Sequence, residues 1–115
     1  MAWTMILSEQ LNRIMTALDI GPDELARALD TNRRTVLRWL ADSHVPQGAS
    51  RKRLDELEAL VDRLESSFKT REGSQAWLRS ECGYFGGLRP IDALLSGRVD
   101  RVDAALEALD AGVFV

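Results

Sequence analysis

The sequence predicts an all-α protein, and three observations support that class. Apolar residues recur at spacings of three and four residues along almost the whole chain. No stretch alternates apolar and polar residues around a two-residue Asn-Gly or Asp-Gly turn, the pattern typical of a β-hairpin. Short segments rich in Gly, Pro and Asp separate the periodic stretches. Together these features predict six or seven short helices.

The first two helices are predicted on either side of a Gly-Pro junction. The first runs roughly from Ser8 to Leu18, with Ser8 as a plausible N-cap. Gly21 suits the C-terminal end of that helix, and Pro22 suits the first turn of the next one. The second helix is expected to end at Leu29, because the polar segment DTN then breaks the apolar pattern.

A third helix is expected from near Asn32 or Arg33 to about Ala41. Its expected inner face consists of Val36, Leu37 and Leu40. Trp39 lies within this amphipathic stretch, where a tryptophan more often belongs to the core than to a surface that stacks on bases. We therefore expect Trp39 to be buried.

The fourth predicted helix follows a loop with Pro46 and Gly48, starts behind a Ser50 cap and ends at Phe68. Its apolar stripe consists of Leu54, Leu57, Val61, Leu64 and Phe68. The stripe is short for a free coiled coil, so we interpret it as packing within the chain.

The polar segment KTREGSQ is the best candidate for a boundary, which predicts two domains, residues 1–68 and 69–115. Short helices are expected at QAWLRS and at PIDALLS, on either side of the glycine-rich turn CGYFGGLRP. Gly97 supplies a left-handed end to the second of these helices. A last helix, from about Arg98 to Ala111, is expected to bury Val99, Val102, Leu106 and Leu109.

The composition is that of a globular chain. The 115 residues are 45% hydrophobic and 29% charged. The longest apolar runs fall far short of the roughly 20 residues that a membrane span needs. The start, MAWTMILSEQ, lacks the charged leader of a signal peptide. We expect a soluble, cytoplasmic protein.

Cys82 is the only cysteine and His44 the only histidine. Neither an internal disulfide nor a zinc knuckle can form from this set. Cys82 and His44 are also the only candidate nucleophile–base pair in the sequence, and they lie in different halves of the chain. We expect that the protein is not an enzyme and that it holds no metal ion and no cofactor.

Positive charge is concentrated in one part of an acidic chain. The net charge is −3, which argues against a protein that coats nucleic acid in general. From Arg33 to Arg53, however, there are six Lys or Arg residues and one acid, Asp42, giving +5 over 21 residues. Such a patch can attract phosphates even when the total charge is negative.

The basic patch coincides with a predicted helix-turn-helix. In that geometry the second helix lies in the major groove. Arg34 and Arg38 share a face of this helix because they are four residues apart. The predicted DNA-binding residues are Asn32, Arg33, Arg34, Thr35, Arg38, Arg51 and Lys52. The alternative is a solvated basic face on an ordinary helical bundle.

The stretch LARALDTNRRTVLRWLADSHVPQ resembles the Xre-type helix-turn-helix domain, and the resemblance covers roughly Ser8 to Phe68. It implies binding to promoter DNA. Basic residues contact phosphates more often than bases, so no sequence preference is assigned to them.

The tail RPIDALLSGRVDRVDAALEALDAGVFV resembles the toxin-binding segment of the Xre/MbcA/ParS antitoxin family. The shared pattern is a proline that opens a short helix, a Leu-Leu pair, a glycine one turn later, a long amphipathic helix and a Gly-Val-Phe near the end. The segment QAWLRS matches the part that precedes it. ECGYFGG departs from the pattern, because the family usually has a short Pro/Asn turn there.

The resemblance implies a partner and a mechanism. Family members pair with a RES-domain toxin, an enzyme that consumes NAD by ADP-ribosyl transfer or phosphorolysis, and cover its NAD cleft with their C-terminal end. The toxin-binding residues that it implies are Pro90, Leu94, Gly97, Arg98, Arg101, Gly112, Val113, Phe114 and Val115. A homodimer or a hetero-oligomer with the toxin is expected.

Two alternatives stay open. Phe114 can fold back on the chain's own core, since a buried aromatic stabilises a fold as well as an interface. In that case the chain is a free-standing Xre-type repressor whose tail only dimerises it.

Overall fold

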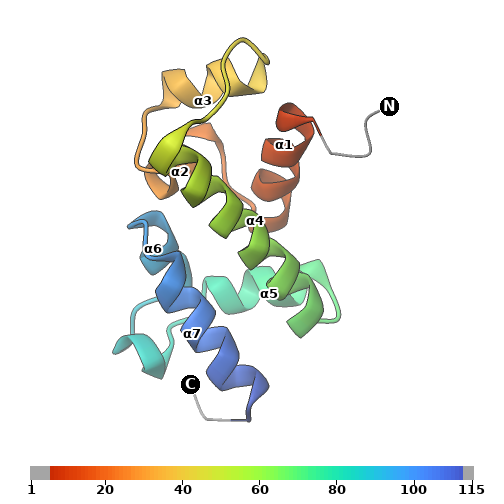
Figure 1. The fold of residues 1–115 in the computed structure, drawn as a ribbon. Helices are drawn as coiled ribbons and strands as arrows, with labels where there is room; N and C mark the ends of the chain where they lie inside the picture. Colours follow the sequence, from red (N-terminus) through yellow and green to blue (C-terminus); the bar gives the residue numbers. More distant parts are fainter. Residues whose placement is uncertain (1–5, 113–115) are drawn as a thin grey trace.

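The computed structural model describes residues 6–112, apart from the side chain of Tyr84, and confirms the all-α class (Figure 1). Seven α-helices and one 3₁₀ turn form within these residues. In chain order they are α1 (Leu7–Leu18), α2 (Pro22–Ala28), α3 (Arg33–Leu40), α4 (Gly48–Ser67), α5 (Arg71–Leu78), η1 (Gly83–Phe85), α6 (Pro90–Leu95) and α7 (Val99–Asp110).

The molecule is elongated, with principal extents of 44 × 30 × 23 Å. Helix α4, with 20 residues, runs through its middle and contacts α1, α5 and α7. Helix α3 lies at one end of the molecule, and the last turn of α7 lies at the other (Figure 1). The predicted DNA-binding helix is therefore remote from the end of the chain's last helix.

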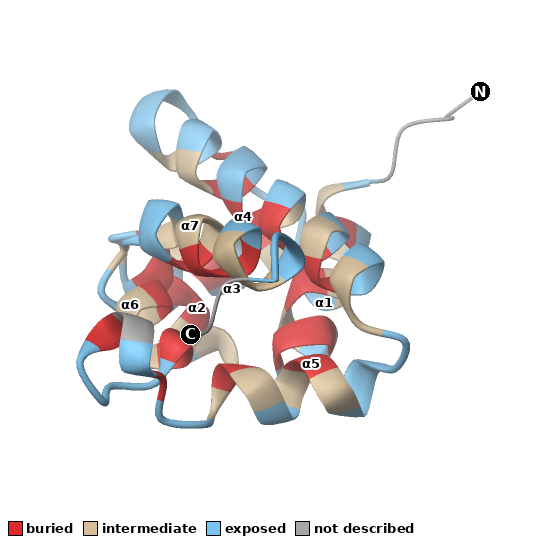
Figure 2. Cartoon of the chain, turned by 90° about the horizontal axis from the view of Figure 1, so that it is seen from below, coloured by how far each residue is buried: buried red, intermediate tan, exposed pale blue. Residues whose placement is uncertain are grey.

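One buried cluster draws on residues from both predicted domains. Leu11, Leu25 and Leu57 from the first part pack in the same cluster as Leu94 and Leu106 from the second, and all five are fully buried. Figure 2 shows the buried faces of the helices turned inward and the exposed faces turned outward. Burial of these leucines is the main force that holds the bundle together.

Three helices in the first part of the chain end with an aspartate in the left-handed region. Asp19, Asp30 and Asp42 follow α1, α2 and α3, with φ values of 56°, 56° and 58°. Aspartate tolerates this conformation better than most residues that carry a Cβ. The prediction that Gly21 ends the first helix was wrong, because Asp19 takes that position and Gly21 is the N-cap of α2.

Two predicted N-caps were also wrong. Ser8 lies inside α1, which starts one residue earlier behind Ile6. Ser50 lies inside α4, whose N-cap is Gln47. By contrast, Thr70 caps α5, its hydroxyl oxygen accepting a hydrogen bond from Gly73 N at 3.0 Å. Helix α5 thus begins inside the segment expected to be a polar boundary.

The inner face of α3 differs from the prediction at one position. Val36 is fully buried and Trp39 is 3% exposed, as expected for core residues. Leu40 is half-buried against the same core. Leu37, predicted to be inside, is 43% exposed. It lies one residue after Val36, which is a rotation of about 100° around the helix axis and places Leu37 on the flank of α3, outside the buried face.

Helix α5 is fastened to the end of α1 by two polar side chains. Gln75 Nε2 donates to the carbonyls of Thr16 and Ala17, each at 3.3 Å. Arg79 Nη2 donates to the carbonyls of Leu18 and Asp19 at 2.9 and 2.8 Å. The last carbonyls of a helix have no partners within it. These four bonds therefore stabilise the end of α1 and fix α5 against it.

Gly97 makes the corner between α6 and α7. Its φ of +81° is favourable only for glycine, and a Cβ there would lie 3.9 Å from the carbonyl oxygen of Ala28. This confirms the expected left-handed end of the helix that PIDALLS forms. Among residues 6–112, no helix has both the length and the apolar character needed to cross a membrane.

Candidate functional site

The first candidate surface is the outward face of α3. Arg34, Leu37 and Arg38 are all exposed on this helix. Asn32 caps its start, because Asn32 Oδ1 accepts hydrogen bonds from Thr35 N at 2.9 Å and from Thr35 Oγ at 3.1 Å. The side chains of Asn32 and Thr35 thus hold each other at the N-terminus of the helix, where base and phosphate contacts are made in helix-turn-helix proteins.

The basic residues around α3 differ in their pairing. Three of them have carboxylate partners: Arg33 with Asp23 at 3.5 Å, Arg51 with Asp55 at 3.3 Å and Arg53 with Asp30 at 3.8 Å. Within the described part of the chain, Arg34, Arg38 and Lys52 form no ion pair and no side-chain hydrogen bond. Their positive charges are therefore uncompensated locally, and they form what we call the free basic face.

The second candidate surface is a hollow of about 160 Å³ between η1, α6 and α7. The residues that line it are Phe85, Leu88, Arg89, Asp92, Ala93, Ser96, Arg98 and Arg101. The guanidinium of Arg101 lies 5.7 Å from the centre of the buried Phe85 ring, within the range of a cation–π contact. Leu88 is 63% exposed at the rim.

Two arginines of this hollow are held by neighbouring acids. Arg89 Nη2 lies 2.9 Å from Asp92 Oδ1, and Arg98 Nη2 lies 2.9 Å from Asp100 Oδ2. The hydrogen bond from each guanidinium lowers the pKa of the carboxyl group that accepts it, and both arginine pKa values are raised in turn. These pairs fix the start of α6 and of α7, because Asp92 also accepts a bond from Arg89 N at 3.3 Å.

The structure spreads the predicted toxin-binding residues over different environments. Pro90 and Leu94 are buried on the inner side of α6. Arg98 and Arg101 are exposed beside the hollow, and Gly112 is exposed after α7 with a φ of +79°. The predicted residues Val113, Phe114 and Val115 lie outside the described residues.

Sequence reasoning missed the contribution of the glycine-rich turn to the hollow. Cys82 N donates to the carbonyl of Leu88 at 3.0 Å, and Gly87 N donates to the carbonyl of Cys82 at 3.0 Å. These bonds close the turn and place Leu88 at the rim of the hollow. The available signal was an apolar Phe-Gly-Gly-Leu run in a polar part of the chain, at the place where the sequence departs from the family pattern.

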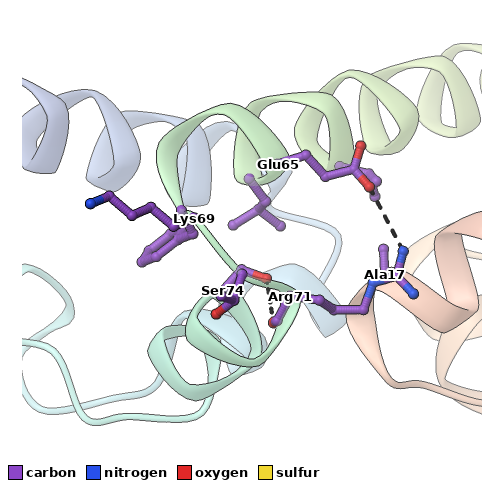
Figure 3. A pocket seen from close by; sticks show the side chains of 9 residues that line it. Ala17, Glu65, Lys69, Arg71 and Ser74 are labelled. Atoms are coloured by element: carbon purple, nitrogen blue, oxygen red, sulfur yellow. Dashed lines mark hydrogen bonds and ion pairs between the residues drawn. The ribbon is translucent and has the colours of Figure 1, made fainter.

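A second cavity, of about 170 Å³, lies where α4 and α5 meet α1. Figure 3 shows Glu65 extending from α4 toward the guanidinium of Arg71, an ion pair of 3.9 Å. Glu65 also pairs with Arg13 of α1 at 2.6 Å. The charged groups around this cavity are thus engaged in ion pairs that join α1, α4 and α5. We interpret these pairs as holding the three helices together.

An acidic hollow of about 240 Å³ at the α6–α7 corner includes Glu56, Asp100 and Asp103. Partial burial raises the pKa of Asp103, with the nearby carboxylates adding to the effect and Arg63 opposing it. Among the residues that the structure describes, no group of three or more His, Cys, Asp or Glu is placed to hold a metal ion.

The chain is similar to curated antitoxins over nearly its whole length. It is 29% identical over 110 residues to the mycobacterial cidal antitoxin MbcA of Mycobacterium tuberculosis, and equally to that of Mycobacterium bovis. The match covers 96% of this chain and 96% of each relative. These relatives are antitoxins, not enzymes, which confirms the expectation that this chain is not an enzyme. No family model matches the chain.

The fold is similar to that of a solved complex. A chain in the crystal structure of the M. tuberculosis MbcT–MbcA toxin–antitoxin complex matches with a TM-score of 0.70 and 28% identity. The match covers 97% of this chain and 100% of that one. In sequence and in fold, the chain is thus a homologue of the MbcA antitoxins, which confirms the resemblance in the sequence.

Proposed function

We propose that this chain is the antitoxin of a two-component system of the MbcT–MbcA type. The observation that carries the proposal is the near-complete structural match to a chain in a toxin–antitoxin complex. The match includes the tail as well as the basic head, so it supports more than a shared DNA-binding motif. The toxin is proposed to be a RES-domain enzyme that consumes NAD, as the sequence resemblance implies.

The tail is the part that we assign to the toxin. Its C-terminal end, Gly112 to Val115, is proposed to cover the NAD cleft. Arg98 and Arg101 are exposed beside the hollow and are suited to polar groups at the edge of such a cleft. Pro90 and Leu94 are buried, so their contribution is to hold α6 in place and thereby shape the surface.

The head is proposed to bind the promoter of its own operon. Arg34, Arg38 and Lys52 supply the positive charge, and the exposed face of α3 is available for the major groove. Arg33 and Arg51 contribute after exchanging their carboxylate partners for phosphates.

Co-expression with the product of the neighbouring gene tests the antitoxin function. The full chain is expected to restore growth, and a chain that stops after Ala111 is expected to fail. Circular dichroism of the truncated chain provides the control, because helix content must be retained for the comparison to be valid. Equal rescue by both chains would contradict the tail mechanism. Failure of the full chain to rescue or to bind the toxin would leave a free-standing repressor.

A further inference from the structure

Leu37 is an apolar residue on the outward face of α3 that the protein's own core does not use. It is 43% exposed, whereas its neighbours Val36 and Trp39 fill the inner face of the helix. Leu40 packs against the core from the edge of that face, but Leu37 is not part of the hydrophobic cluster. Leu37 is therefore not one of the residues that build the core.

The neighbours of Leu37 on the outward face are the two free arginines of α3. Arg34 precedes Leu37 by three residues and Arg38 by four, so Arg34 has Leu37 on one side and Arg38 on the other along the exposed surface of the helix. The long side chains of arginine reach phosphates or guanine acceptors, while a leucine has no hydrogen-bonding group. Charge alone thus explains the arginines but not the residue between them.

The major groove offers a specific apolar partner for such a residue. Of the base edges exposed there, thymine presents a C5-methyl group, and apolar side chains recognise it by contact. If α3 lies in the groove with its basic face toward the DNA, Leu37 lies at the edge of that face beside Arg34, where it can reach the edges of the bases. The exposed side of α3 therefore presents arginines that can bind phosphates and a leucine that can contact a methyl group.

We propose that Leu37 reads the C5-methyl group of a thymine in the operator, and that this contact contributes sequence preference beyond the phosphate contacts of the free basic face. The inference rests on the proposed DNA-binding function and deepens it. It assigns a recognition role to a residue that was predicted to be in the core.

Replacement of thymine by deoxyuridine tests the contact, because deoxyuridine pairs in the same way and lacks only the methyl group. A duplex that binds the full-length chain is first enriched from a random-sequence library. Each thymine is then replaced in turn, and affinities are measured for the native chain and for Leu37→Ala. For the native chain, replacement at one position per half-site is expected to weaken binding about fourfold, the equivalent of one buried methyl group.

The same replacement should leave the affinity of Leu37→Ala unchanged, since that variant has already lost the contact. Leu37→Met keeps an apolar side chain of similar size and should retain most of the methyl effect. Val45→Ala is the matched control, because Val45 is a 64% exposed apolar residue in the loop after α3. It should keep the full effect.

The outcomes separate the two levels of the proposal. If no duplex is enriched, and if the affinity for random-sequence DNA does not depend on salt concentration, the proposed DNA-binding function itself is wrong. If a duplex binds but Leu37→Ala keeps the full methyl effect, or no thymine position shows one, the role of Leu37 is wrong while DNA binding stands. Loss of self-association in Leu37→Ala, measured by sedimentation, without any methyl effect would instead assign Leu37 to a contact between copies and overturn the proposal.

Discussion

The arginines at the two ends of the molecule are placed in opposite ways. On α3, Arg34 and Arg38 extend into solvent and have no acidic partner among residues 6–112. In the tail, Arg89 and Arg98 are held by Asp92 and Asp100 at 2.9 Å. An unpaired guanidinium keeps all its donors for a phosphate, whereas a paired one must first lose its carboxylate. The first arrangement suits a polyanion, and the second fixes the start of a helix.

The comparison shows that local pairing describes a surface better than residue counts do. The first region contains six basic residues between 33 and 53, yet three of them are paired across or within helices. The tail arginine that lacks an ion pair, Arg101, lies over Phe85. The guanidinium of Arg101 therefore contacts a buried aromatic ring and not a carboxylate.

Replacing Leu94 by alanine should have the largest effect. The variant tests whether Leu94 holds the fold of the tail together or contacts the toxin. Leu94 is fully buried, so the cavity left behind should lower the free energy of unfolding by about 2–5 kcal/mol. Urea denaturation measures this change. The exposed Arg101→Ala is the counterpart, with stability nearly unchanged and toxin binding weakened. A stable Leu94→Ala protein would show that Leu94 is not a supporting residue.

Replacing Arg79 by methionine should have the next largest effect, because it cuts the connection between the two regions. The variant keeps an apolar stem but loses both hydrogen bonds to the end of α1. Leaving those carbonyls unsatisfied should cost about 1–3 kcal/mol in the free energy of unfolding. Hydrogen exchange should show faster opening of the last turn of α1. Unchanged protection there would mean that water replaces the guanidinium without cost.

Arg34→Ala and Arg38→Ala test the free basic face. Each should weaken DNA binding by about 1 kcal/mol or more and reduce the slope of log affinity against log salt by about one. Titration of a fluorescent duplex at several salt concentrations measures both. Arg63→Ala is the matched control, since Arg63 lies on α4 and pairs with Asp110 at 3.6 Å. An equal loss in the control would show that overall charge governs binding, not this face.

Asp103→Asn should produce the smallest effect on stability, and the size of that effect depends on pH. The folded-state pKa of Asp103 is raised, mainly by burial, so the ionised carboxylate opposes folding above that pKa. The asparagine variant should be slightly more stable than the native chain at neutral pH. The gain should disappear as pH falls below the ordinary aspartate pKa, where both states of the native protein bind the proton. Urea midpoints at several pH values measure the trend, and a gain that persists in acid would contradict it.

The sequence was sufficient to predict the helix content, because apolar spacing persists wherever one face is buried. It predicted the ends of helices less well. Gly21 was expected to end α1, but Asp19 adopts the left-handed conformation two residues earlier. The pattern of an aspartate after each of the first three helices is visible in hindsight. A single aspartate, however, is also favourable in the first turn of a helix, so the residue alone does not mark a helix end.

The candidate surfaces were predictable to different degrees. Charge clustering was enough to locate the basic helix, since it needs only the order of residues. The division into free and paired arginines was not predictable, because Asp23 of α2 and Asp30, just after α2, meet Arg33 and Arg53 only in the fold. The misplacement of Leu37 has a different origin. An eight-residue helix has too few turns for periodicity alone to fix its inner face.

The attachment of α5 to α1 has a consequence for anyone who divides this chain. A fragment that stops at Phe68 loses Gln75 and Arg79, and the four carbonyls from Thr16 to Asp19 lose their donors. It also uncovers the apolar side of α4 that α7 shields. Such an excised head would be prone to fraying and to aggregation, so α3 and the tail are best expressed and engineered as one piece.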